Sequence, residues 1–426
     1  MQKTDPRYSA YLTILNHHLV PAMGCTEPIA IAYAAAIATR ALGKMPEHAS
    51  VLVSGSILKN AKSVTVPNTA GQKGIGAACA AGIIAGDPAK ELQVLSDVNA
   101  EQLERIEAFA RSGAIVVELM PQARLFDILV TVKSGESSAS ARIADRHTNV
   151  VRVERNNVPL YSAPLCGDEL AADTDEALLT IEGAYDFASS CDIADVRTVL
   201  DLQIEYNTRI AREGITGEWG ACVGKLLLEC YGDSDVRMRA KAYAAAGSDA
   251  RMSGCELPVV INSGSGNQGI TVSVPVIEYA RALGSSDVAL YRALVLSNLA
   301  AIRQKALIGC LSAYCGAISA GCAAGAGIAY LLGGDLHIIN HTIVNSLAIL
   351  SGTICDGAKP SCAAKIACAV DAGLMGYQMA LHNRQFRGGE GIVTKGIENT
   401  IRNVGRLGRD GMRETNEEIL KIMTDC

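Results

Sequence analysis

Residues 306–334 read ALIGCLSAYCGAISAGCAAGAGIAYLLGG and contain no charged side chain. Residues 338–355, IINHTIVNSLAILSGTIC, are also free of Asp, Glu, Lys and Arg. The chain as a whole has 41 glycines and only 4% aromatic residues. Because small side chains let helices approach closely, these two stretches predict buried, tightly packed helices at 311–333 and 338–354.

The first stretch is also long enough to cross a bilayer, which is the alternative interpretation. It lacks belts of Trp or Tyr at both ends, and no second span of comparable length with an asymmetry of Lys and Arg accompanies it. We therefore expect a buried helix of a soluble enzyme and no membrane association.

Further helices are expected through the second half of the chain, at 174–189, 193–213, 219–231, 236–247, 274–284, 286–309, 360–382, 394–407 and 414–424. In the first half of the chain, the residue pattern predicts helices at 7–20 and 28–42. It also contains strand-like runs at 49–54, 62–66, 113–119, 125–133, 138–144 and 148–154, the last four of which suggest an antiparallel meander.

The expected fold class is therefore α+β, with a mixed N-terminal part containing antiparallel strands, followed by a predominantly helical C-terminal domain. A polar segment at 155–175 is the expected seam. It divides the chain into a mixed α/β part at 1–170 and a helical domain at 171–426.

The charge balance bears on the partners of the chain. A net charge of -6 and a pI near 5.7 argue against binding to nucleic acid, and no basic run with interleaved aromatic residues occurs. The first residues, MQKTDPRYSAYL, contain no apolar segment typical of a signal peptide, which predicts a cytoplasmic location. The 14 cysteines are then expected to be reduced thiols.

Three of these cysteines, Cys315, Cys355 and Cys362, lie in or beside the uncharged stretches. A buried free thiol is inert, whereas a metal deprotonates it and makes it a ligand. Three thiolates leave an open coordination position, as a Lewis-acid catalyst requires. Plain packing of small apolar residues is the alternative interpretation. The last residue, Cys426, is either part of a disordered tail or a reversible fourth ligand.

The loop INSGSGNQG at 261–269 follows an apolar run and predicts an anion-binding turn. A substrate carboxylate would fit its backbone N–H groups. A tight buried turn is one alternative, and the substrate loop of a pyridoxal-phosphate dehydratase is another, for which Lys305 and Lys365 are the nearest Schiff-base candidates. The substrate-binding residues predicted in this loop are Ser263, Gly264, Ser265, Asn267 and Gln268.

A helix start in PAMGCTEP, residues 21–28, places Cys25 next to Thr26 and Glu27, both predicted to bind substrate. A helix dipole lowers the pKa of a thiol, which would make Cys25 a base or nucleophile, although packing explains it equally well.

The segment LKNAKSVTVPNTAGQKG, residues 58–74, offers Asn60, Lys62 and Asn68 as further substrate-binding residues. Solvated turn residues are the alternative interpretation here. His147, Glu218 and Glu390 are weaker candidates: the histidine lies on an expected strand edge, and the two carboxylates are flanked by glycines.

Five motifs in order along the chain resemble the L-cysteine desulfidase family, which is related through its helical half to the iron-sulfur L-serine dehydratases. These motifs are PAMGCTEP, LKNAKSVTVPNTAG, VVINSGSGNQG, LSAYCGAISAG and GTICDGAKPSCAAK. The resemblance implies an oxygen-sensitive 4Fe-4S cluster held by Cys315, Cys355 and Cys362 in the helical domain. It also implies that Cys25 accepts a proton and that pyridoxal phosphate takes no part.

The expected reaction is the α,β-elimination of L-cysteine to hydrogen sulfide, pyruvate and ammonia, a step of cysteine catabolism. The alternatives are an L-serine or L-threonine dehydratase with the same cluster, a non-catalytic iron-sulfur sensor, and a membrane carrier. The residues leave open whether cysteine or serine is the physiological substrate, whether the chain forms a homo-oligomer, and whether the cluster survives purification in air.

Overall fold

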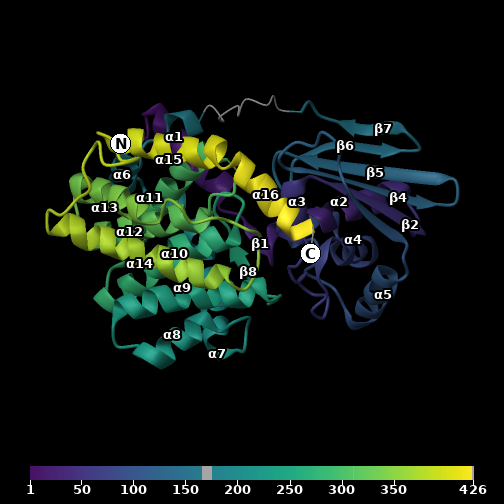
Figure 1. Cartoon of the computed structure of the whole chain (residues 1–426), viewed down its shortest axis with the longest axis horizontal. Helices are drawn as coiled ribbons and strands as arrows, with labels where there is room; N and C mark the ends of the chain where they lie inside the picture. Colours follow the sequence, from purple (N-terminus) through teal and green to yellow (C-terminus); the bar gives the residue numbers. More distant parts are fainter. Residues whose placement is uncertain (166–174, 310, 425–426) are drawn as a thin grey trace.

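The computed structural model describes residues 1–165, 175–309 and 311–424. It has two parts: a helical part, on the left of Figure 1, and a part in which helices cover a β-sheet, on the right. The α+β fold class is therefore confirmed.

The helical part is built around α12 (Gly316–Leu331), which packs against α10 (Gly266–Leu283), α11 (Asp287–Ile308), α13 (Leu336–Leu350) and α14 (Cys362–Leu381). Almost every residue of α12 is buried. Around this core lie α6 (Ile181–Ser190), α7 (Ile193–Thr216), α8 (Val223–Tyr231), α9 (Val236–Met252) and α15 (Ile397–Arg406).

Glycine lets α12 and α14 touch backbone to backbone. A Cβ on Gly321 would lie 2.4 Å from the carbonyl oxygen of Ala369, and one on Gly325 would lie 2.6 Å from that of Gly373. Both contacts join residues 48 positions apart in the chain, so the two helices run parallel. This confirms the expectation of tightly packed helices of small residues.

The expected helix at 311–333 begins later, at Gly316, and the one expected at 338–354 ends at Leu350. The reason is a short extended pairing, in which Tyr314 forms an isolated antiparallel bridge with Ile354. Helix α10, expected from 274, begins instead at Gly266, so the end of the INSGSGNQG loop forms its first turn.

The sheet has six strands in the order β3-β2-β4-β5-β6-β7. Its strands are β2 (His48–Val53), β3 (Ile115–Leu119), β4 (Asp127–Ser134), β5 (Ser137–Ala144), β6 (Val150–Arg155) and β7 (Val158–Ser162). The meander expected from 113 to 154 is wrong for its first strand, because β3 pairs in parallel with β2 and β2 separates it from β4. The alternating residues Ile128, Val130 and Val132 of β4 are buried, and α2 (Thr26–Leu42) packs on β4, β5 and β6.

The strand expected at 62–66 is also wrong. These residues follow α3 (Gly55–Ala61) and form only one isolated bridge, between Thr65 and Lys73. The alternating pattern of residues 62–66 resembles a strand, but no described strand lies beside them to form a continuous set of backbone hydrogen bonds. The sequence also gave no indication of α4 (Gly74–Ala85) or α5 (Ala100–Arg111).

Several elements connect the two parts. The short strand β1 (Pro21–Met23) pairs with β8 (Pro258–Val260), and α1 (Pro6–His18) packs against the helical part. At the other end of the chain, α16 (Arg413–Thr424) crosses to α3, as Figure 1 shows. The division of the chain at residue 170 stays a prediction.

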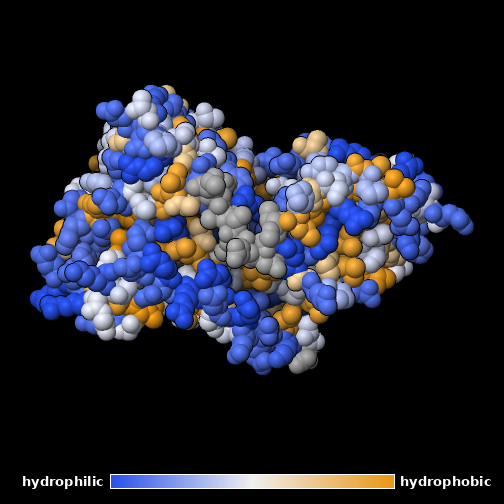
Figure 2. Space-filling model, turned by 90° about the horizontal axis from the view of Figure 1, so that it is seen from above, coloured by the Kyte–Doolittle hydropathy of each residue, from blue (hydrophilic) through white to orange (hydrophobic). Residues whose placement is uncertain are grey.

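The surface seen in Figure 2 has small hydrophobic groups interspersed among hydrophilic residues. Within the three described segments of the chain, no helix is both long enough and apolar enough to cross a membrane.

The contact between α12 and α14 predicts that Gly373→Ala destabilises the protein. The new methyl group would lie 2.3 Å from the carbonyl oxygen of Gly321, so the helices must separate. We expect the free energy of unfolding to fall by about 1–3 kcal/mol, measured by chemical denaturation. Gly76→Ala in α4 is the matched control, because a Cβ there meets nothing within 4 Å. A Gly373→Ala variant as stable as the control would contradict this close contact.

Candidate active site

A cavity of about 110 Å³ lies between the two parts of the molecule. It brings together twelve of the fifteen residues predicted from the sequence to form the site. Cys25, Thr26, Glu27 and Asn60 come from the sheet part, whereas Ser263, Gly264, Ser265, Asn267, Gln268, Cys315, Cys355 and Cys362 come from the helical part.

Three predicted residues are not among those lining the cavity. The ammonium group of Lys62 donates to the carbonyl oxygen of Met423 in α16. Asn68 donates to the carbonyl oxygen of Leu95 at 2.6 Å and holds a turn. Cys426 lies outside the described residues.

Of the weaker candidates, His147 lines the cavity. Glu218 is bound to Lys225, and Glu390 is exposed and accepts a hydrogen bond from the backbone N–H of Arg387. Neither carboxylate lines the cavity.

The three helical-part thiols meet because of two backbone features. The bridge between Tyr314 and Ile354 places Cys315 and Cys355 on neighbouring extended segments, with hydrogen bonds from Cys315 N to Thr353 O (3.1 Å) and from Cys355 N to Ala313 O (2.6 Å). Cys315 immediately precedes α12, and Cys362 is the first residue of α14. Because these helices run parallel in a fixed register, their first residues lie at the same end.

Burial raises the pKa of Cys315 to about 12, and the nearby Cys355 and Cys362 add to the shift. Burial likewise raises the pKa of Cys362. These two thiols therefore stay protonated at neutral pH unless a metal displaces their protons.

The spacing of the thiols distinguishes between kinds of metal centre. Within the part of the chain that the structure describes, these three sulfurs do not form a group with all atoms within 4.8 Å of one another. A single tetrahedral zinc ion would hold its sulfur ligands about 3.8 Å apart. The three thiols are therefore not placed for one tetrahedral zinc ion, whereas in a cluster each thiolate binds a different iron. Their soft sulfur donors, one ligand short of a closed zinc site, are compatible with an iron-sulfur cluster.

The loop that carries Cys355 is held by ion pairs. Asp356 pairs with Lys359 and with Lys365, whose Nζ also donates to the carbonyl oxygen of Ile354 at 2.9 Å. Burial raises the pKa of Asp356, but the two lysines outweigh burial and hold it at about 2. A further lysine, Lys59, is buried and donates to the carbonyl oxygen of Cys355 at 3.1 Å. Lys365 is thus engaged in the loop.

Cys25 caps α2 and lies beside Glu27. Its Sγ donates to Glu27 Oε2 at 3.0 Å, and Asn60 Nδ2 donates to Oε1 of the same carboxylate at 2.9 Å. His147 Nε2 lies 4.0 Å from Glu27 Oε1. Thr26 joins the two parts of the molecule, since its Oγ1 donates to the carbonyl oxygen of Gly264 at 2.9 Å.

The expectation that the helix dipole lowers the pKa of Cys25 is wrong. Burial raises the pKa of this thiol well above its ordinary value, and the charge of Glu27 raises it further. Burial also opposes ionisation of Glu27, but His147 and the Cys25 thiol overcome it and hold the pKa of Glu27 below its usual range. At rest the pair is a thiol that donates to a carboxylate.

The loop at 263–268 opens with a tight turn, closed by backbone hydrogen bonds in both directions between Asn262 and Ser265 at 3.1 Å, and anion binding there stays a prediction. Ser263 and Gly264 have φ of 50° and 79°, in the left-handed region, and Gly266 begins α10. A network of buried side-chain amides supports the 263–268 loop from the protein interior. Asn262 donates to Asn298 Oδ1 at 2.9 Å, and Asn298 in turn exchanges hydrogen bonds with Gln203. No sequence motif marks these supporting amides.

Four helices begin at the cavity. The residue before α2 is Cys25, the one before α10 is Ser265, the one before α12 is Cys315, and α14 starts at Cys362. Each of these residues lines the cavity. Helix N-termini carry partial positive charge and unpaired N–H groups, so their convergence favours an anionic ligand.

Arg251, near the end of α9, also lines the cavity and is only 3% exposed. Its Nη1 donates to Asn267 Oδ1 at 3.1 Å. Sequence reasoning missed Arg251, because an arginine near a helix end usually lies at the surface.

Five buried polar atoms of cavity residues have no hydrogen-bond partner within the described residues: Asn60 Oδ1, His147 Nε2, Arg251 Nε, Gln268 Oε1 and Tyr314 Oη. Leaving such an atom unpaired costs about 1–3 kcal/mol. Donors and acceptors are both represented. The cavity is therefore suited to a small polar ligand that carries donors and acceptors of its own.

The contact between Cys25 and Glu27 predicts that Glu27→Gln makes the thiol more reactive. Removing the negative charge lowers the pKa of Cys25, so its alkylation in iron-free protein should reach half-maximal rate at lower pH. Peptide mass spectrometry of iodoacetamide-treated protein measures this rate. Glu218→Gln is the control, because Glu218 likewise accepts from a thiol, that of Cys222 at 3.5 Å, outside the cavity. A shift at Cys25 in the control but not in Glu27→Gln would contradict the assignment.

Comparison with known proteins identifies relatives of this chain. The profile of the family described as serine dehydratase alpha chain matches residues 89–421. A UPF0597 protein of Desulfitobacterium hafniense (strain Y51) is 55% identical over 423 residues, which cover 99% of this chain and 98% of that protein. UPF0597 proteins of Lachnoclostridium phytofermentans and Finegoldia magna are 50% and 45% identical, over 98% and 97% of this chain and 99% of each relative.

The region matched by the family profile includes the three thiols, the 263–268 loop and Arg251, but it begins after Cys25 and Asn60. The similarity to the three relatives extends over nearly the whole chain. The relation to serine dehydratases inferred from the motifs is confirmed.

Proposed function

Because the chain belongs to the serine dehydratase alpha chain family, whose members are lyase-type enzymes, we propose that it catalyses an iron-sulfur-dependent α,β-elimination of L-cysteine. The products are hydrogen sulfide, pyruvate and ammonia. The single observation that carries the proposal is that one small cavity contains three converging thiols, a fourth thiol beside a carboxylate, and unpaired polar atoms suited to an amino acid.

Cys315, Cys355 and Cys362 are the residues that would hold the 4Fe-4S cluster. When bound by three protein thiolates, such a cluster supplies an iron with an open position, which acts as a Lewis acid toward the leaving group. All three thiols are free; Cys315 is buried and the other two are half-buried, which supports this assignment.

The unpaired atoms suggest how the substrate lies. Arg251 Nε and the N–H groups at the start of α10 are donors, which suit the substrate carboxylate. Asn60 Oδ1 and Gln268 Oε1 are acceptors, which suit the substrate ammonium group.

Cys25 is the proposed base. Its thiol is oriented by the hydrogen bond to Glu27 Oε2 at 3.0 Å. After the thiol has lost its proton to solvent, the thiolate takes the α-proton of the substrate. Arg251 favours the thiolate electrostatically. Loss of the α-proton and of the β-sulfur leaves aminoacrylate, and the sulfur departs as sulfide. Water then converts aminoacrylate to pyruvate and ammonia.

L-Serine, or L-threonine, is the second candidate substrate, with water as the leaving product. The description of the family favours it, and so does one group in the cavity. Tyr314 Oη is buried and unpaired, and burial raises the pKa of this phenol well above its usual value. A neutral hydroxyl at this place could protonate a departing hydroxide, which is a poorer leaving group than sulfide.

The deciding experiment is an anaerobic assay of iron-reconstituted protein with L-cysteine and, in parallel, with L-serine. Sulfide, pyruvate and the visible absorption of the cluster are followed together. Equal rates of sulfide and pyruvate that depend on the cluster support the proposal. Pyruvate from serine alone assigns the second candidate, and a stable cluster without either product assigns a sensor.

The proposed ligands predict the effect of single thiol removals. Cys315→Ser, Cys355→Ser and Cys362→Ser should each lose the cluster absorption and the turnover together, because the cluster then has too few thiolates. Iron content per chain and the visible spectrum measure the loss. Cys368→Ser is the matched control, since Cys368 lies on the same helix as Cys362 but is exposed. Full iron content in any of the three variants would remove that cysteine from the ligand set.

The proposed base predicts a different outcome for Cys25→Ser. This variant should keep its iron and spectrum, because Cys25 is not a proposed ligand, yet lose turnover by about 10²-fold or more, the usual effect of removing a general base. Steady-state pyruvate formation at matched cluster content measures this effect. Turnover equal to that of the unmodified protein would exclude Cys25 as the base.

A further inference from the structure

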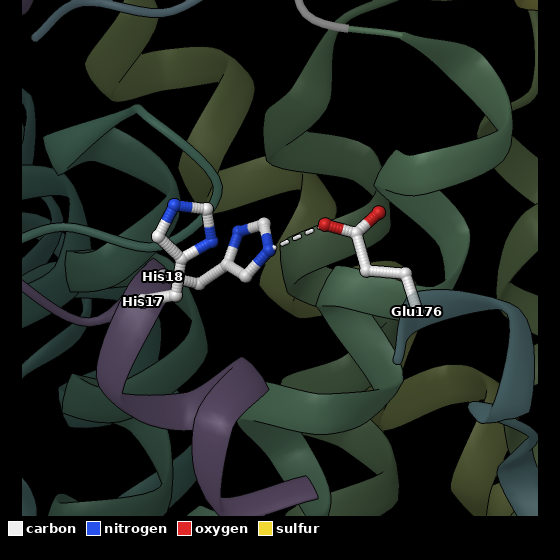
Figure 3. A group of neighbouring side chains, drawn as sticks. All are labelled: His17, His18 and Glu176. Carbon is white, nitrogen blue, oxygen red and sulfur yellow. Dashed lines mark hydrogen bonds and ion pairs between the residues drawn. The ribbon is translucent and has the colours of Figure 1, made fainter. Parts of the chain in front are cut away.

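A second group of metal-binding side chains lies outside the thiol cavity, at the end of α1. The donor atoms of His17, His18 and Glu176 all lie within 4.8 Å of one another. His18 Nε2 is 2.8 Å from Glu176 Oε1, and the ring centroids of His17 and His18 are 5.1 Å apart. Figure 3 shows both imidazoles on one helix, with the Glu176 carboxylate pointing toward His18.

Backbone elements fix these side chains relative to one another. His17 and His18 form the last turn of α1, and Glu176 begins the short 3-10 helix η2 (Glu176–Leu178). The fully buried Tyr11 of α1 donates from its hydroxyl to the carbonyl oxygen of Leu178 at 2.9 Å. This bond holds η2 against α1. The three donor atoms are thus arranged before any ion binds, which lowers the cost of binding.

The donor set indicates which ions fit. Two imidazole nitrogens and one carboxylate oxygen are typical ligands of zinc and of neighbouring divalent transition metals, and three protein ligands leave a position for water. The thiol cavity offers soft sulfur ligands instead. The two sites therefore differ in the metals that they favour.

One positive group competes for this site. Arg146, in the turn between β5 and β6, has its Nη1 2.9 Å from His17 Nε2. In Figure 3 the other ring nitrogen of His17 faces His18, so Arg146 acts on a cation between the three side chains through its positive charge. Arg146 also precedes His147, which lines the thiol cavity and packs edge to face on Phe126 with ring centroids 4.7 Å apart. The same turn thus contacts both sites.

We propose that His17, His18 and Glu176 bind one divalent transition-metal ion of the zinc class, and that the positive charge of Arg146 weakens this binding. The site lies between the two parts of the molecule, because α1 packs on the helical part and Arg146 belongs to the sheet part. The proposal does not depend on which amino acid the enzyme eliminates.

The test is equilibrium dialysis of the cluster-reconstituted full chain against Co²⁺, with cobalt measured per chain. The double variant His18→Gln, Glu176→Gln should lose one cobalt per chain, with affinity for that ion reduced by more than about tenfold. His382→Gln is the matched control, because His382 is exposed and bonds only within its own helix in the described residues. Cobalt bound by the thiols is the same in every variant. The cobalt per chain in the double variant is therefore subtracted from that in the control to give the cobalt at this site.

Arg146→Gln provides an outcome that misfolding cannot produce. Removing the competing positive charge should tighten cobalt binding. Equal cobalt binding by the unmodified protein and the double variant overturns the site. Cobalt binding by Arg146→Gln that is no tighter than that of the unmodified protein overturns the effect of Arg146.

Discussion

The close parallel contact between α12 and α14 is the constraint on which the candidate active-site cavity depends. Gly321, Gly325 and Gly373 let the two backbones touch, and the contact keeps a constant offset along both helices. The same offset places Cys315, just before α12, opposite the first turn of α14, where Cys362 lies. Two proposed cluster ligands are thus brought together by glycines one to three turns away, and the Tyr314–Ile354 bridge adds the third.

Function and stability oppose one another in this cavity. Four helix N-termini, a buried arginine and five unpaired polar atoms meet in one small space. A buried polar atom left unpaired costs about 1–3 kcal/mol, so these groups favour a bound ligand or water that pairs with them. The closely packed helices beside the cavity, with α12 almost entirely buried, hold the groups in place.

The residues that the sequence revealed are those whose chemistry is visible without knowledge of burial. Cysteines in uncharged stretches and a glycine-serine loop stand out by type and spacing, and the structure brings them to one cavity. Arg251 and Tyr314 do not stand out, because only their burial and their unpaired atoms mark them. The prediction that Lys62 binds substrate fails because its local structure differs from the expected one. Its segment was expected to be a strand, whereas it follows a short helix that directs the Lys62 side chain toward α16.

The order of the strands could not be predicted for a related reason. Local alternation identified β3, β4, β5 and β6, but the pairing of β3 with β2 joins residues more than 60 positions apart, and no local pattern encodes it. The supporting network of Asn262, Asn298 and Gln203 likewise joins three distant segments.

The proposed catalytic groups are divided between the two parts of the molecule, and this division limits how far the parts can move. The sheet part contributes Cys25, Glu27 and Asn60, whereas the thiols and Arg251 come from the helical part. A base and an electrophile must act on adjacent atoms of one substrate, so a shift of about 1 Å between the parts would reduce the rate. The pairing of β1 with β8 and the bond from Thr26 to Gly264 both lie next to the reacting groups. They hold the two parts together where alignment matters most.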